Sequence, residues 1–329
     1  MGKVTSRDVA REAGVSQNTV SLVVRHSPRV RAETRLAVEE AMARLHYQPN
    51  AVASALRSQT TQSLAFVVAA GDLHNHVTAE LLAGAVEGAA AHDYTVVAVP
   101  SPPDDRGAAV VTLFRRQKIS GALVFAPATD APLVATLAAA DCPTVSLLQP
   151  SSAIPLERSV TADDYGGGAA AVRHLLERGH RRLGLIGVRA GETNAMARAR
   201  MAAARAVTAA AGLPLDVALA GDWSVEAGRA AAAELLARPA RPSAIFAISD
   251  RLAFGVLQAA GAAGLAVPAD LAVVGFDNVE WAQYCSPPLT TVEFPLRDVA
   301  IAGVDRLLGN DPATQWTSAP ARLMVRESS

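Results

Sequence analysis

The 329-residue chain contains few cysteines, with Cys142 and Cys285 standing alone in the sequence. Two isolated cysteines form no disulfide framework, and their spacing fits no zinc site. We therefore expect no metal and no cofactor. No apolar run reaches the length of about twenty residues that crosses a bilayer, and no charged-then-apolar leader begins the chain. These absences predict a cytoplasmic protein without a membrane partner.

An excess of charge of one sign is also missing, because 30 Lys and Arg face 31 Asp and Glu. The balance differs along the chain. Residues 1–61 hold nine basic and five acidic side chains, whereas the remainder holds 21 and 26. A basic head on a mildly acidic body is expected where the head alone meets phosphate groups.

Residues 4–24 predict two short helices joined by a tight turn. Thr5 and Ser16 can cap the helices with their hydroxyls, and Gly14 stands where the chain must turn sharply. Apolar residues recur at helical spacing and predict one buried face, made by Val9, Ala10, Val15, Val20, Val23 and Val24.

Polar side chains remain on the exposed face of the second helix. Gln and Asn amides can pair bidentately with adenine in the major groove, and hydroxyls pair with several base edges. An ordinary helical hairpin has the same polar exterior, so this segment alone leaves both interpretations open. The candidate DNA-binding residues of the head are Thr5, Ser16, Gln17, Asn18, Thr19, Ser21, Leu22 and Arg25.

From residue 63 onward, apolar runs alternate with helical stretches. This alternation is typical of a parallel sheet that is covered by helices on both faces. A second set of such runs begins near Ser159. Two sets predict two doubly wound lobes with a cleft at the carboxyl ends of their strands.

The head resembles the amino terminus of the LacI/GalR family of transcriptional repressors, in the pattern D-V-A-x-x-A-G-V-S-x-x-T-V-S at residues 8–21. Residues 33–56 resemble the family's third helix, its Y-x-P-N link and its hinge helix. Further family motifs follow in the family's order at residues 179–187, 244–258, 267–278 and 286–292. The resemblance therefore extends over nearly the whole chain.

The resemblance implies an all-α helix-turn-helix head at residues 1–46 and a hinge helix at 47–60. Residues 61–329 would form an α/β domain like that of periplasmic binding proteins, with two doubly wound parallel-sheet lobes. The family's chain crosses between the lobes. This crossing implies a first lobe of about 61–160 and 291–318, and a second lobe of about 161–290 and 319–329.

The resemblance also assigns DNA contacts. A hinge-helix leucine of the family wedges between base steps in the minor groove, which kinks the duplex, and Leu56 stands at that position. The implied hinge contacts are Asn50, Ala53, Leu56 and Arg57. In the head, Leu22 replaces a frequent base-reading arginine, which predicts an operator without the guanine preference that this arginine gives.

In this family the cleft binds a small effector, often a sugar or a nucleobase. Arg200 matches the effector-binding arginine, and a guanidinium can fork two hydrogen bonds onto hydroxyls or a carboxylate. Asp277 matches a ligand acceptor, and Trp223 a residue that stacks on sugar faces. A surface arginine and a core tryptophan are the plain structural alternatives. Ser249 is a further contact that the resemblance implies, and Asp72 and His74 are candidates because they follow the first core strand and can add polar groups to the pocket wall.

The first lobe departs from sugar-binding relatives, with Leu148 where many carry an acid and Ala126 in place of a polar residue. A polyol needs such partners, since each unpaired buried hydroxyl costs about 1–3 kcal/mol. A sugar and another metabolite therefore both stay open as effectors. The glycines at 166–168 lack the Lys-Ser/Thr of a phosphate loop and predict a strand-to-helix turn.

Together these features predict a repressor that binds a palindromic operator in double-stranded DNA as a homodimer, controlled by a small-molecule effector. Metabolic genes, carbohydrate genes among them, are the expected targets. A small-molecule-binding protein related to solute-binding proteins is the alternative. The sequence shows no nucleophile elbow, zinc helix or phosphate loop, so no enzyme is expected.

Overall fold

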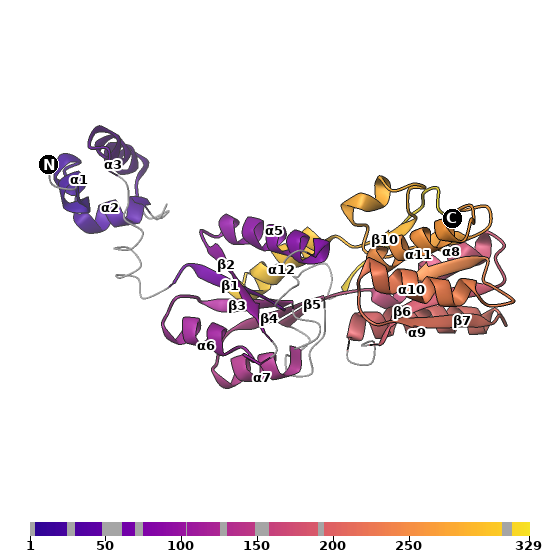
Figure 1. Ribbon diagram of the computed structural model, residues 1–329. Helices are drawn as coiled ribbons and strands as arrows, with labels where there is room; N and C mark the ends of the chain where they lie inside the picture. Colours follow the sequence, from indigo (N-terminus) through magenta and orange to yellow (C-terminus); the bar gives the residue numbers. More distant parts are fainter. Residues whose placement is uncertain are drawn as a thin grey trace. The chain divides into compact units, whose positions relative to one another are not determined.

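The computed structural model describes residues 4–24, 30–47, 61–69, 75–102, 104–125, 130–148, 158–189, 194–310 and 318–329 (Figure 1). The chain divides into two compact units, Met1–Thr61 and Gln62–Ser329, and each is described by itself. Within the described ranges, no helix is long and apolar enough to span a membrane.

The first unit contains three helices, α1 (Ser6–Glu12), α2 (Gln17–Val24) and α3 (Ala32–Arg44). Its small core is made by Val9, Ala10, Val20, Val23, Val38 and Ala41. The predicted inward face is thus confirmed at four positions, while Val15 and Val24 are half-buried and pack against this core.

Local contacts fix the start of α1 and the turn between α1 and α2. The Asp8 carboxylate accepts hydrogen bonds from the backbone N and the hydroxyl of Thr5, at 2.9 and 2.6 Å. Gly14 has a φ of +66°, which side chains disfavour. The Ser16 hydroxyl accepts a hydrogen bond from the backbone N of Thr19 at 3.1 Å and caps α2.

The first lobe of the second unit is built on a six-stranded parallel sheet in the order β11-β5-β4-β3-β1-β2. Its strands are β1 (Ser63–Ala69), β2 (Thr95–Ser101), β3 (Gly121–Phe125), β4 (Thr144–Leu148), β5 (Ser159–Ala162) and β11 (Ser318–Ala319). Its helices are α5 (His76–Ala91), α6 (Ala108–Arg115), α7 (Asp130–Ala139) and α12 (Leu296–Leu308). Successive β1 residues face opposite layers, since Leu64 and Phe66 join one core cluster while Ala65 and Val67 join another.

The second lobe is built on a four-stranded parallel sheet in the order β7-β6-β8-β9. Its strands are β6 (Leu183–Val188), β7 (Leu215–Ala220), β8 (Ala244–Ala247) and β9 (Ala272–Val274). Its helices are α8 (Asp164–Glu177), α9 (Ala195–Ala210), α10 (Val225–Leu236) and α11 (Asp250–Ala262), which pack as the pairs α8 with α9 and α10 with α11. The predicted fold class, a helical head followed by two parallel α/β lobes, is confirmed.

The chain returns to the first lobe at α12. Strand β10 (Thr291–Glu293) pairs antiparallel with β12 (Arg322–Met324), and the neighbouring Thr290 bridges to Val274 at the end of β9. Helix α12 then packs on α5 and on strands of the first sheet, beside α5 in Figure 1 although far from it in sequence.

Two boundaries differ from the expectation. The run at Ser159 begins no second set, because β5 pairs with β4 in the first sheet, and Ala319 pairs with Ala162 of β5. Strand β10 lies beside β9 rather than in the first lobe. Periodicity shows that a strand is buried, but hydrogen bonding between distant segments decides the sheet to which it belongs.

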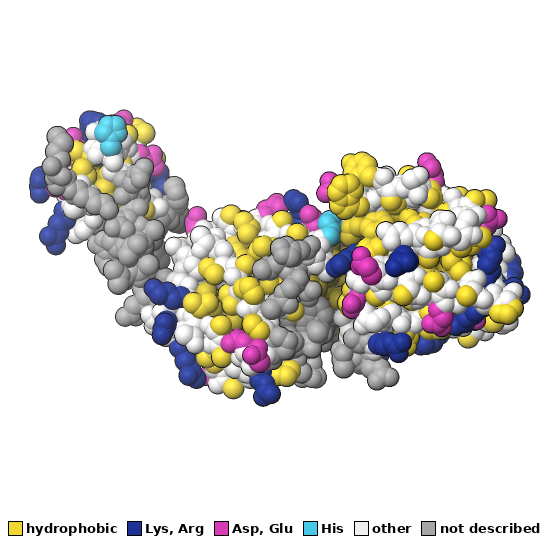
Figure 2. Space-filling view, viewed as in Figure 1, with side chains coloured by type: hydrophobic (Ala, Val, Ile, Leu, Met, Phe, Trp, Pro, Cys, Tyr) yellow, Lys and Arg dark blue, Asp and Glu magenta, His cyan; other side chains and the backbone are white. Residues whose placement is uncertain are grey.

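Charges on the larger unit are mixed. Figure 2 shows Lys and Arg side chains interspersed with Asp and Glu over the visible face of both lobes. Such mixing gives that face no single-signed field.

Candidate functional site

An ion-pair network of the second lobe surrounds Arg200 of α9, which is 3% exposed. Its Nε donates to Asp164 Oδ1 at 2.8 Å, and its Nη1 donates to Asp277 Oδ1 at 3.0 Å. Nη1 also donates to the carbonyl oxygen of Ile248 at 2.8 Å. The guanidinium carbon lies 3.6 Å from the centroid of the Phe276 ring, a cation–π contact.

The network perturbs the pKa values of its members. Burial raises the pKa of Asp164, although Arg200 opposes this rise. Burial also raises the pKa of Asp277 to about 6, again against the effect of Arg200. Burial acts to lower the pKa of Arg200, but the two carboxylates more than offset it and the pKa is raised.

Small residues allow this network to form. The sequence predicted that the glycines at 166–168 form a turn between a strand and a helix. They lie instead within α8, close to its start. A Cβ at Gly168 would lie 3.0 Å from the carbonyl oxygen and 3.1 Å from the Cα of Arg200. The missing side chain lets α8 approach α9, which brings Asp164 to Arg200.

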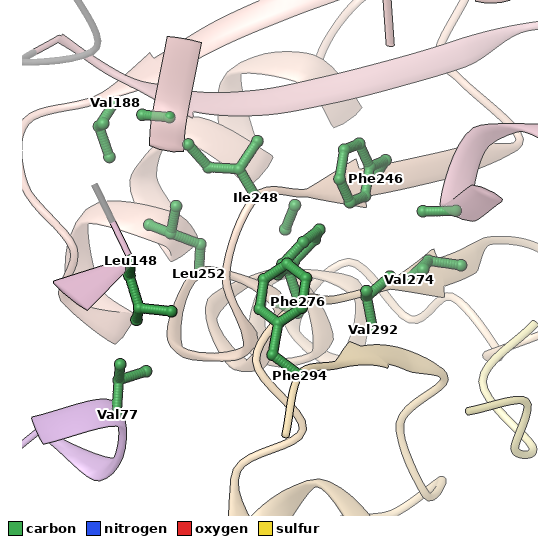
Figure 3. Close-up of a cluster of buried hydrophobic side chains, with 14 of the residues drawn as sticks. Val77, Leu148, Val188, Phe246, Ile248, Leu252, Val274, Phe276, Val292 and Phe294 are labelled. Atoms are coloured by element: carbon green, nitrogen blue, oxygen red, sulfur yellow. The ribbon is translucent and has the colours of Figure 1, made fainter. Parts of the chain in front are cut away.

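A cavity of about 250 Å³ lies beside the network and is lined by both lobes. The first lobe contributes Asn75, Val77, Phe125 and Leu148. The second lobe contributes Asn194, Met196, Arg200, Trp223, Arg251 and Asp277, and the connection into α12 adds Phe294 and Leu296. Figure 3 shows Val77 and Leu148 on one side of Phe276 and Phe294.

Strand ends, helix starts and the loops between them carry this lining. Phe125 and Leu148 end β3 and β4, and Leu148 adopts a φ of +64°, which is strained for a branched side chain. Asn75 and Asn194 cap α5 and α9, accepting hydrogen bonds from the backbone N of Val77 and Ala197, each at 3.0 Å. The cavity thus lies where doubly wound sheets bind ligands.

The structure places three of the predicted effector contacts on the cavity wall, namely Arg200, Trp223 and Asp277. Ser249 differs from the expectation. It is 3% exposed, and its hydroxyl accepts a hydrogen bond from the backbone N of Leu252 at 3.3 Å, so it caps α11 instead of lining the cavity. Asp72, His74 and Ala126 lie outside the described residues.

Sequence reasoning missed several lining residues. Asn75, Asn194 and Arg251 stand at helix starts, and the rule that helices begin at the cleft end of each strand could have found them. Phe294 carries no such signal, because it reaches the cavity from the connection between β10 and α12. Over the described stretches, no group of three His, Cys, Asp or Glu residues could hold a metal ion.

In the head, some candidate DNA contacts are exposed, and others form hydrogen bonds within the head. Asn18 and Ser21 are exposed, whereas Leu22 is half-buried. Gln17 differs from the expected free amide, since its Nε2 donates to the Ser6 hydroxyl at 2.7 Å and joins α2 to α1. Thr5, Ser16 and Thr19 make the local capping contacts described above or a hydroxyl pair at 2.8 Å. Outside the described residues lie Arg25, Asn50, Ala53, Leu56 and Arg57.

Comparison with known proteins identifies relatives for both units. The model of the lacI family of bacterial regulatory proteins matches residues 5–50, and that of periplasmic binding protein-like domains matches residues 172–329. The HTH-type transcriptional regulator DegA of Bacillus subtilis (strain 168) is 33% identical over 340 residues, covering 99% of this chain and 98% of DegA. The HTH-type transcriptional repressor PurR of Edwardsiella ictaluri (strain 93-146) is 32% identical, covering 92% of this chain and 89% of PurR.

Solved structures agree with these matches. The Lac repressor dimer bound to operator and the anti-inducer ONPF has a TM-score of 0.80 and 28% identity, and 99% of each chain is covered. The complex of the transcriptional regulator CelR with cellobiose has a TM-score of 0.70 and 30% identity, covering 99% of this chain and all of that one, 100%.

Proposed function

This chain belongs to the LacI family of DNA-binding transcriptional repressors, and on that premise we propose that it binds a palindromic operator as a homodimer controlled by a small molecule in the cavity. Regulators of this family are not enzymes. The observation that carries the proposal is one chain holding both a helix-turn-helix and a cavity lined by two lobes.

The head supports operator reading. Helix α2 presents Asn18 and Ser21 to solvent, and an amide on an exposed second helix can pair with adenine in the major groove. Two heads related by a twofold axis read two half-sites, so the operator is palindromic. Leu56 and its hinge neighbours Asn50, Ala53 and Arg57 are proposed to act in the minor groove between the half-sites.

An exposed aromatic pair supports association with a second copy. Trp281 is 69% exposed and Tyr284 is 66% exposed, and their rings meet edge to face at 6.4 Å. Large exposed aromatic side chains in contact are typical of protein interfaces. The Lac repressor, to which this chain is similar, is a dimer on its operator.

Control by a ligand follows from differential binding. A molecule that contacts both walls of the cavity stabilises one arrangement of the lobes over another, and this difference is the free energy that can change operator affinity. The target genes in this proposal are metabolic genes linked to the effector, with carbohydrate genes as the case for a sugar.

Selection of bound fragments from random and genomic DNA by the purified chain tests the proposal. We expect a palindromic consensus that Asn18→Ala and Leu56→Ala each weaken, with Arg205→Ala on the exposed face of α9 as the matched control. Leu22→Arg should enrich guanine at one step, since an arginine–guanine pair is worth about 1–3 kcal/mol. Salt-sensitive binding without any consensus would overturn the operator proposal.

A further inference from the structure

Four helices begin at the cavity. Asn75 and Asn194 cap α5 and α9, Trp223 precedes the Ser224 cap of α10, and Arg251 is the second residue of α11. Each helix start carries a partial positive charge of about half an elementary charge, from backbone N–H groups without helical partners. The polar rim of the cavity is therefore suited to an anion.

Two arginines line the cavity, Arg200 and Arg251, and they differ in their ion-pair partners. Arg200 is occupied by Asp164 and Asp277, which together outweigh its charge. Arg251 is exposed and, within the described residues, forms no ion pair. The pKa of the exposed Asp222 is lowered mainly by a hydrogen bond from Ser224, and Arg251 lowers it least.

The remaining wall is apolar. Phe125, Leu148, Met196, Trp223 and Phe294 surround the space, and Asn75 is the polar residue that the described part of the first lobe contributes. An apolar cavity of about 150 Å³ takes up benzene, so about 250 Å³ suits one ring with a short substituent. A polyol would leave hydroxyls unpaired against this wall.

We propose that the effector is a small organic acid with a single ring, its carboxylate held by Arg251 and its ring among Trp223, Leu148 and Phe125. Asp277, which also lines the cavity, accepts a hydrogen bond from a hydroxyl or amine on the ring. The inference rests on the proposed function, because it names the ligand of the same cavity.

Titration of the full chain with benzoate and benzamide, followed by calorimetry, tests the charge requirement. The two molecules have nearly the same size and differ in charge. We expect benzoate to bind on the order of tenfold more tightly, as for a hydrogen bond to a charged group. Arg251→Gln should abolish this preference, Arg251→Lys should retain part of it, and Arg205→Gln on the exposed face of α9 should retain all of it.

Three results would overturn the inference: equal binding of the two probes, binding of neither at tens of millimolar, roughly ten times above a weak millimolar Kd, or preferential binding of ribose or cellobiose. The operator selection separates this failure from that of the proposed function. A palindromic consensus without a benzoate preference would support the repressor proposal and contradict the organic-acid effector. A benzoate preference that depends on Arg251, without a palindromic consensus, would support the anion site and contradict the operator proposal.

Discussion

The two lobes share one architecture but present different walls to the cavity. The first lobe offers Val77, Phe125 and Leu148 with a single capping amide, whereas the second offers Arg200, Asp277 and Arg251. The sheets of both lobes are parallel, so the backbone does not cause this difference. It arises from residues at strand ends and helix starts, where side chains vary without disturbing the sheets.

The second lobe is also the more preorganised of the two. Arg200 is held by two carboxylates, a carbonyl and a ring, so its position is determined by several contacts at once. The first lobe has no comparable buried network among its described residues. We infer that the second lobe fixes the orientation of a ligand and the first supplies apolar cover.

Removing the central cation should have the largest effect. Arg200→Met leaves the buried Asp164 and the partly exposed Asp277 without a counter-charge. We expect a loss of about 3–5 kcal/mol in the unfolding free energy, measured by urea titration of the full chain. Arg205→Met, on the exposed face of the same helix, should cost little. Equal losses for the two variants would contradict the preorganised second lobe.

The pH dependence of stability should follow Asp277. Its pKa of about 6 in the folded chain exceeds the unfolded value of about 3.9. The folded state therefore binds the extra proton between these values, so its stabilisation is full below pH ~4 and is lost as the pH rises through ~6.

A matched variant isolates this effect. Relative to Asp277→Asn, the wild-type chain should lose roughly 2–3 kcal/mol between pH 4 and 7. Thermal unfolding of both chains over this range measures the difference. Parallel pH profiles would show that Asp277 is not the group responsible.

The aromatic support beneath Arg200 should give an intermediate effect. Phe276→Leu removes the ring that contacts Arg200 at 3.6 Å and Phe294 at 5.4 Å. Phe66→Leu in β1 is the matched change in the first lobe, since both side chains are fully buried. We expect Phe276→Leu to cost about 1 kcal/mol more in urea unfolding, the value of a ring or cation–π contact. Equal losses of unfolding free energy for the two variants would show that the contact between the Phe276 ring and Arg200 adds no stability.

The capping amides should give the smallest effects. Asn75→Ala and Asn194→Ala each remove one side-chain hydrogen bond at a helix start, which costs about 1 kcal/mol. Asn194 is 4% exposed, so its variant should cost more than that of the half-buried Asn75. Chemical denaturation measures the loss of unfolding free energy in the two variants. A larger loss for Asn75→Ala would contradict this difference between the first-lobe and second-lobe caps.

Much of the fold was predictable, and less of the site. Residues 63–69 and 183–188 are continuous apolar runs, and buried parallel strands have that composition. Ser249 shows the limit, because a residue after a strand can cap the next helix or face a ligand, and both roles favour a hydroxyl. Gln17 shows it again, since an amide expected to face DNA bonds to Ser6.

The sequence by itself determined the helix-turn-helix, the two parallel sheets and the family, because periodicity, caps and ordered motifs are local properties of the chain. Only the tertiary structure decided that β5 joins the first sheet, that β10 lies beside β9, and that Asp164, Arg200 and Asp277 form one network. These residues are separated by 36 and 77 positions, and their contact depends on how helices pack and strands pair. Local sequence patterns do not show which residues that far apart in the chain come into contact.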